Sequence, residues 1–214
     1  MKKNIAYKYR IYPNQAQQVL ISKTFGCVRF IFNQMLGDRI AYYKETGLSL
    51  KNTPAKYKKE FEWLKEVDSL ALANAQLHLD VAYKNFFRDK KVGFPKFKSK
   101  KHSSNSYTTN MVNNNIKLIG NKIYLPKLKG IRIKKHRDIP ENYKIKSVTV
   151  SKTPTNKYYV SILCEYEADV LENVGTNYLG LDYAMNGLYV ASDNSRGDYP
   201  RFYRQLEKKL HREQ

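Results

Sequence analysis

The order of hydrophobic periods along the chain is the feature that most constrains its fold. Residues 3–12 partly alternate between apolar and polar side chains, as expected for one strand. Helical periodicity follows, and strand-like alternation returns only after residue 115. Because a single strand is not stable by itself, residues 3–12 must pair with the later strands. The sequence therefore predicts an α+β fold, with a β-barrel or curved sheet and a helical insertion between its first and second strands.

The insertion begins with a long helical segment. Asn14 follows Pro13 and is placed to cap this segment. Two glycines, Gly26 and Gly37, interrupt it and are expected to break it into two or three helices. Its apolar residues recur at helical spacing, at Leu20, Phe25, Val28, Phe32, Met35, Leu36, Ile40 and Tyr43.

Two further helices are predicted in the insertion. Thr53-Pro54 is typical of a helix start, with a cap followed by a first-turn proline. Asp68 is placed to cap an amphipathic helix that carries apolar residues near one face. We interpret His78 on that helix as a packing or surface residue rather than a ligand.

The later strands are short and separated by turn residues. Two runs around Gly120-Asn121 form a hairpin signal, and GIRIKKHR follows. KIKSVTVSKT and KYYVSILCEYE are expected to pair across the turn Pro154-Thr155-Asn156. Residues 168–177 are interpreted as a linker, and residues 199–214 as a basic helix.

The stretch NYLGLDYAMNGLYVASDN, residues 177–194, places one carboxylate between two apolar runs. Its first run is expected to be a buried strand that ends at Asp182. The chain pauses at Asn186-Gly187 before the second run. Without further information, these residues favour a turn or cap role for Asp182.

The charge of the chain indicates a polyanionic partner. Lys and Arg number 39 against 19 Asp and Glu, a formal charge of +20. From Lys90 to Arg137 there are 14 basic residues and no acid. Phe94, Phe97 and Tyr107 are interleaved with this charge and are suited to stack on unpaired bases. We therefore predict nucleic-acid contact in this span rather than a merely solvated loop.

Other classes are disfavoured. No apolar run approaches the ~20 residues that span a bilayer, and the basic N-terminus lacks the apolar core of a signal peptide. Cys27 and Cys164 form neither a disulfide framework nor a metal knuckle, and are interpreted as small buried hydrophobes in a reducing compartment. The expected localisation is cytoplasmic.

Five segments together carry a family resemblance. They are KYRIYPNQAQQ, TFGCVRFIFNQML, VGFPKFKSKK, YLGLDYAMNGLYVASD and PRFYRQLEKKLHREQ. In this order they resemble the TnpB family, transposon-encoded proteins long described as transposases that act as RNA-guided DNA endonucleases. The resemblance covers essentially the whole chain.

The resemblance implies a domain arrangement. It implies a β-barrel wedge domain (1–13 and 106–168), a helical recognition insertion with the basic loop (14–105), and the start of an RNase H-like RuvC nuclease domain (177–214). Its implied partners are a guide RNA and target DNA, both double-stranded and as the displaced single strand, without a membrane.

The resemblance also assigns Asp182 to the first acidic residue of the RuvC catalytic set, which holds magnesium. Ala184 stands where many members have glycine. The family's later glutamate, final aspartate and four-cysteine zinc ribbon have no counterpart in these 214 residues, so zinc is not expected. We expect magnesium to bind weakly or not at all here, and the chain to be inactive alone.

Two functions therefore remain open beside a generic basic RNA-binding protein. One is the N-terminal part of an RNA-guided endonuclease whose C-terminal half is missing, and the other is a free-standing, repressor-like binder without cleavage. Candidate nucleic-acid contacts, each weighed against simple surface charge, are Lys8, Arg10, Arg29, Asn33, Lys96, Lys98, Lys100, Lys101 and Tyr107.

Overall fold

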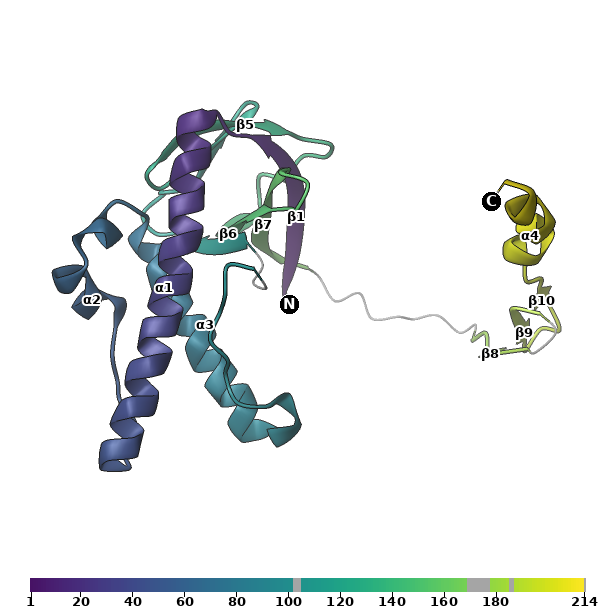
Figure 1. Ribbon diagram of the computed structural model, residues 1–214. Helices are drawn as coiled ribbons and strands as arrows, with labels where there is room; N and C mark the ends of the chain where they lie inside the picture. Colours follow the sequence, from purple (N-terminus) through teal and green to yellow (C-terminus); the bar gives the residue numbers. More distant parts are fainter. Residues whose placement is uncertain (102–104, 169–177, 185–186, 214) are drawn as a thin grey trace. The chain divides into compact units, whose positions relative to one another are not determined.

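The computed structural model describes residues 1–101, 105–168, 178–184 and 187–213. The chain divides into two compact units, Met1–Ala168 and Asp169–Gln214. Figure 1 shows the helices and the curled sheet of the first unit. Within the described ranges, no helix is long and apolar enough to cross a membrane.

The first unit is built on a seven-stranded antiparallel sheet in the order β2-β6-β7-β1-β5-β4-β3. The sheet curls into a half-barrel (Figure 1). Its strands are β1 (Lys2–Tyr12), β2 (Asn105–Asn110), β3 (Lys117–Ile119), β4 (Lys122–Leu125), β5 (Leu128–Lys134), β6 (Lys144–Lys152) and β7 (Tyr158–Glu167).

The first strand lies inside the sheet rather than at its edge. β1 pairs with β7 from Lys2↔Glu167 to Ile11↔Tyr158. Its C-terminal end also pairs with β5, from Arg10↔Lys134 to Tyr12↔Arg132. The prediction that residues 3–12 join the later strands is confirmed, and so are the hairpin at Gly120 and the β6–β7 pair.

A single long helix follows β1. Helix α1 (Gln15–Thr46) begins with a capping box, in which the Asn14 side chain accepts from the Gln17 backbone and the Gln17 side chain accepts from the Asn14 backbone. The helix ends at Gly47, which is left-handed at φ 69°. The expected breaks at Gly26 and Gly37 are wrong, because the buried face of α1 contacts both the sheet and another helix, and this packing outweighs the weak helix propensity of glycine.

The other predicted helices are confirmed. Helix α2 (Pro54–Glu60) has proline in its first turn, although Thr53 makes no side-chain capping bond. A 3₁₀ turn, η1 (Glu62–Lys65), leads to α3 (Ser69–Arg88), where Asp68 Oδ1 accepts from the Leu70 backbone. Another 3₁₀ turn, η2 (Lys90–Val92), follows α3.

One hydrophobic core joins the helices to the concave side of the sheet. It contains Ile31 and Met35 of α1, Leu72 and Leu79 of α3, and Ile162 of β7. Both cysteines are buried as predicted, and burial raises the pKa of the Cys27 thiol to about 11. The cysteines therefore serve as small apolar side chains.

Strand β2 was not predicted. Its sequence, NSYTTN, is polar, and only its β-branched and aromatic residues favour a strand. It forms the edge of the sheet beside β6, with Tyr107 and Thr109 facing the core. Residues 105–110 therefore form a strand because they pair with β6, and not because their own sequence is hydrophobic.

The second unit is small. Its strands β8 (Leu181–Asp182), β9 (Tyr189–Ala191) and β10 (Arg196–Gly197) form an antiparallel sheet in the order β10-β9-β8, followed by the predicted basic helix α4 (Phe202–Glu213). The expectation of a buried strand before Asp182 is wrong, because Leu181 is 62% exposed. No described residue of this unit covers β8. The predicted linker, apart from Ala168, and Asn186 of the predicted turn lie outside the described residues.

We expect Gly26→Ala to stabilise the protein by about 0.5–1 kcal/mol. Gly26 lies inside α1, and a Cβ built there meets nothing within 4 Å. Urea unfolding measures the effect as a higher midpoint. Gly47→Ala is the opposite control, since its positive φ makes a side chain costly, and an unchanged or lower midpoint for Gly26→Ala contradicts the prediction.

Candidate nucleic-acid interface

The basic loop, which follows η2 and carries Phe94, Lys96, Lys98, Lys100 and Lys101, is hydrogen-bonded to the side chain of Asn33 on helix α1. Asn33 Nδ2 donates to the Lys98 carbonyl at 2.8 Å, and Asn33 Oδ1 accepts from the Lys98 backbone N–H at 2.7 Å. This paired bond joins positions 65 residues apart in sequence. The amide of Asn33, a candidate nucleic-acid contact, is therefore used to position the loop.

The four candidate lysines of this loop differ in their surroundings. Lys96, Lys100 and Lys101 are exposed, as phosphate contacts require. The Lys98 ammonium instead lies 4.0 Å from the centre of the Phe32 ring, and burial lowers the pKa of Lys98. It also lies beside His78, whose pKa is lowered first by burial and then by Lys98.

Two other candidates occupy less accessible positions. Tyr107 is only 3% exposed and packs its ring 5.9 Å from that of Phe25. Burial raises the pKa of Tyr107, and the nearby Asp68 adds to the effect. Its ring is therefore not free to stack on a base in the way that the sequence analysis predicts for Tyr107. Arg29 lies half-buried on α1.

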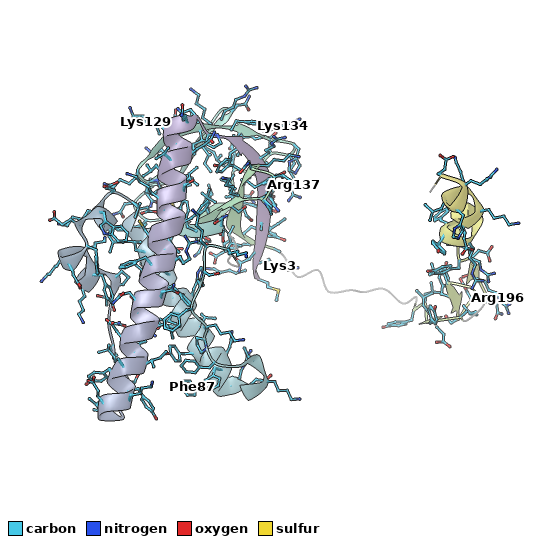
Figure 2. The ribbon with its side chains drawn as sticks, viewed as in Figure 1. Lys3, Phe87, Lys129, Lys134, Arg137 and Arg196 are labelled. Carbon is cyan, nitrogen blue, oxygen red and sulfur yellow. The ribbon has the colours of Figure 1, made fainter. Side chains whose placement is uncertain are left out.

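A second cationic surface lies on the convex side of the sheet. We call Lys8, Arg10, Arg132 and Lys134 the outer cationic face. The registers Arg10↔Lys134, Arg10↔Tyr159 and Tyr12↔Arg132 bring these strands together. Because side chains alternate along a strand, Tyr7, Tyr9 and Ile11 face the core while Lys8 and Arg10 face outward. Figure 2 shows Lys134 at the β5 end of this surface.

Tyrosine rings lie close to three of these four cations. Lys8 Nζ lies 5.2 Å from the centre of the Tyr159 ring, while the Arg10 and Arg132 guanidinium centres lie 5.0 and 5.7 Å from the Tyr12 ring. Within the described part of the chain, no member of the outer cationic face is in a salt bridge. Three of the four charges therefore have an aromatic neighbour, and none of the four is neutralised by a described acidic side chain.

Hydroxyl groups extend the outer cationic face across the sheet. One row runs from Lys8 through Ser161 and Thr149 to Thr108, and the Thr149 and Thr108 hydroxyls lie 2.8 Å apart. Positive charges and hydroxyls on one surface are suited to phosphate and sugar oxygens. Lys8, Arg10, Lys134, His136, Thr153 and Tyr159 line a hollow of about 500 Å³ on this surface.

The sequence did not single out Arg132, Lys134 or the two tyrosines. Alternation in LKGIRIK places Arg132 and Lys134 on one face of β5 and was an available signal. However, the alternation does not identify β1 as the neighbouring strand. Only the strand register of the structure shows that β5 pairs with β1.

Asp182 lies in the second unit on an exposed two-residue strand. Its backbone pairs with Val190. Asp193, on the turn after β9, accepts from the Ser195 backbone at 2.9 Å, and hydrogen bonding by Ser195 lowers the pKa of Asp193. Among the described residues, no three His, Cys, Asp or Glu side chains are grouped to hold a metal ion, so these residues do not fit the magnesium site that the resemblance implies.

Comparison with known proteins identifies relatives of this chain. Residues 1–47 match the family model HTH_OrfB_IS605, described as a helix-turn-helix domain. In this structure the matched residues form a strand and one long helix. A "Putative RNA-guided DNA endonuclease" of Streptomyces pristinaespiralis is 33% identical over 96% of this chain and 52% of its own length. InsQ of Escherichia coli K12, which carries the same description, is 30% identical over 99% and 53%.

Two further matches differ in extent. The virulence protein VsdF of Salmonella dublin is 38% identical over 44% of this chain and 92% of its own length. A structure described as a Cas12f1–sgRNA–target DNA complex overlaps 99% of this chain and 61% of its own, at 10% identity and a TM-score of 0.39.

The chain is thus a homologue of proteins described as RNA-guided DNA endonucleases. It belongs to the TnpB family, of the OrfB/IS605 type, and spans about half the length of the curated relatives that it matches over its whole length.

We expect Asn33→Ala to loosen the basic loop. Losing both hydrogen bonds to Lys98 should cost about 1–3 kcal/mol of unfolding free energy. Trypsin should cut after Lys96, Lys98, Lys100 and Lys101 faster in this variant than in wild type. Ser22→Ala, at an exposed position of α1, is the control, and equal cleavage rates for all three proteins contradict the anchoring role.

Proposed function

We propose that this chain is the nucleic-acid-binding part of an RNA-guided DNA endonuclease. The outer cationic face carries the proposal, because three of its four cations lie over tyrosine rings and none of the four has an anionic partner in the described structure. Phosphates are the anions that such a surface neutralises. Two relatives match nearly all of this chain, and both are named as RNA-guided DNA endonucleases. We take the RNA guide and the DNA target of the proposal from these names.

The proposed roles follow the placement of the residues. Lys8 and Arg10 act with Arg132 and Lys134 on phosphates, and Lys96, Lys100 and Lys101 form a second contact on the basic loop. In the finer assignment, residues 1–13 and 106–168 are the wedge barrel, residues 14–105 are the recognition insertion, and residues 177–214 begin a RuvC-like nuclease domain. The first unit contains both helices and strands, and its helices lie between two strands that belong to the same sheet. This arrangement supports the assignment.

Cleavage is proposed to require acids beyond Asp182. In the family, magnesium held by several carboxylates supplies the activated water for phosphodiester cleavage. Asp182 is the one family-matched acid of this chain. The remaining catalytic carboxylates would have to come from a second polypeptide, such as the C-terminal half of a full-length relative.

The alternative is a free-standing nucleic-acid binder without nuclease activity. The described residues favour it, since Asp182 belongs to no group of three or more His, Cys, Asp or Glu side chains among them that could hold a metal ion. The DNA downstream of codon 214 distinguishes the two. A reading frame there with a glutamate-bearing strand and a C-x-x-C pair supports the endonuclease, and its absence supports the binder.

We expect the double variant Arg10→Ala/Lys134→Ala to bind structured RNA more weakly and with less salt dependence. Each lost phosphate contact makes the slope of log affinity against log salt shallower by about 1, so the pair changes it by about 2. Fluorescence anisotropy at several salt concentrations measures this slope. The matched control, Lys51→Ala/Lys59→Ala, removes equal charge at exposed positions and should keep the wild-type slope. Identical slopes in all three proteins would rule out this surface.

We expect Asp182→Ala to leave nucleic-acid binding unchanged, and neither wild type nor variant to nick DNA. Asp182 is exposed and, among the described residues, belongs to no group of three or more side chains that could hold a metal ion. The assay supplies guide RNA, matched target, and magnesium or manganese. Nicking by wild type that disappears in Asp182→Ala would show that unrecognised acids complete the site.

A further inference from the structure

A second kind of site lies between the C-terminal halves of α1 and α3. It is a hollow of about 610 Å³, within the size range of ligand pockets, and we call it the aromatic hollow. Figure 2 shows Phe87 between these two helices. The residues used below are Arg39 and Tyr43 of α1, Asp80, Tyr83 and Phe87 of α3, and Phe94 of the basic loop.

The aromatic hollow exposes flat apolar surface. Phe87 is 75% exposed, Tyr43 63% and Phe94 45%. The rings of Tyr83 and Phe87 are nearly parallel, with centres 6.3 Å apart, and Phe94 stands edge-on to Tyr83. Exposed aromatic rings gathered at one hollow indicate a binding surface. Their flat faces are suited to a stacked planar ligand.

One cation in the aromatic hollow is held rigidly. Arg39 Nη1 donates to Asp80 Oδ1 at 2.7 Å, and Arg39 Nε donates to Asn52 Oδ1 at 3.1 Å. The guanidinium centre also lies 5.7 Å from the Tyr83 ring centre. Asn52 is itself fixed, because its side chain donates to the Tyr57 hydroxyl at 2.6 Å. Arg39 is therefore preorganised at the wall of the hollow.

The same ion pair leaves donor and acceptor atoms available. Arg39 Nη2 and Asp80 Oδ2 make no hydrogen bond or salt bridge within the described ranges. The Asp80 side chain is 43% exposed. Every nucleobase carries a donor and an acceptor on one edge. A base stacked on the rings therefore has polar partners, and Lys44, which also lines the hollow, supplies positive charge for its phosphate.

We propose that the aromatic hollow binds an unpaired base of single-stranded nucleic acid. The inference deepens the proposed function and rests on it, since the basic surfaces must first bring a strand to the protein. An unpaired base is favoured over a paired one, because taking a base out of a duplex costs a few kcal/mol. Base-specific selection is not expected, because stacking accepts any base.

The test uses single-stranded RNA and DNA oligonucleotides, each with one 2-aminopurine. Wild type should quench the fluorescence of 2-aminopurine as it stacks, and the two arms show which strand supplies the base. Phe87→Ala should relieve the quenching and weaken single-strand binding roughly 5- to 100-fold. Binding to a fully paired duplex should change less than about twofold. Because Phe87 is mostly exposed, its removal leaves the core intact.

Further variants distinguish a failure of this inference from a failure of the proposed function. Tyr43→Ala, on the facing helix, should reproduce the loss, whereas Val81→Ala, at an exposed position of α3 outside the hollow, should not. Salt-dependent binding with unchanged quenching in Phe87→Ala and Tyr43→Ala overturns this inference and leaves the proposed function standing. No binding to any oligonucleotide overturns both. A change in sedimentation caused by Phe87→Ala, without a change in quenching, assigns the hollow to a second copy of the chain and overturns the inference.

Discussion

The pairing of β1 between β5 and β7 is the constraint on which the first unit depends. It places the N-terminal strand at the centre of the sheet and joins the strands that precede and follow the helical insertion. Both ends of the insertion are therefore tied to one framework. The same pairing aligns Arg10 with Lys134 and Tyr159, and Lys8 with Ser161, so the outer cationic face exists only when these three strands are assembled.

Local chemistry made much of this fold predictable. Asn14 and Asp68 cap their helices through side-chain hydrogen bonds. The strand and turn pattern near Gly120 predicted a hairpin, and the structure has one there. Where the sequence misled, a distant contact decided the outcome. Gly26 stays helical because the part of α1 around it, from Ile21 to Leu36, packs into the core, and Tyr107 is buried because β2 pairs with β6. Such contacts are not visible in a window of neighbouring residues.

The candidate interface was predictable to a similar degree. An acid-free run of lysines pointed to the basic loop, but charge alone could not separate exposed Lys96 from Lys98, which lies against Phe32. Asn33 carried no signal for its part in anchoring the loop, since its partner is the backbone of a remote residue. Arg39 was missed for the same reason. Its position depends on Asp80 and Asn52, which come from two other segments.

The central position of β1 also has a consequence for biosynthesis. Lys2 finds its partner, Glu167, about 165 residues later in the chain. At 5–20 residues per second, β1 must wait on the order of 10 s on the ribosome before β7 is made. The helices α1 and α3 are synthesised much earlier and can associate first. Until β5 is made the first strand has unpaired backbone groups on both sides, and until β7 is made one side stays unpaired, which makes the nascent chain a candidate for chaperone protection.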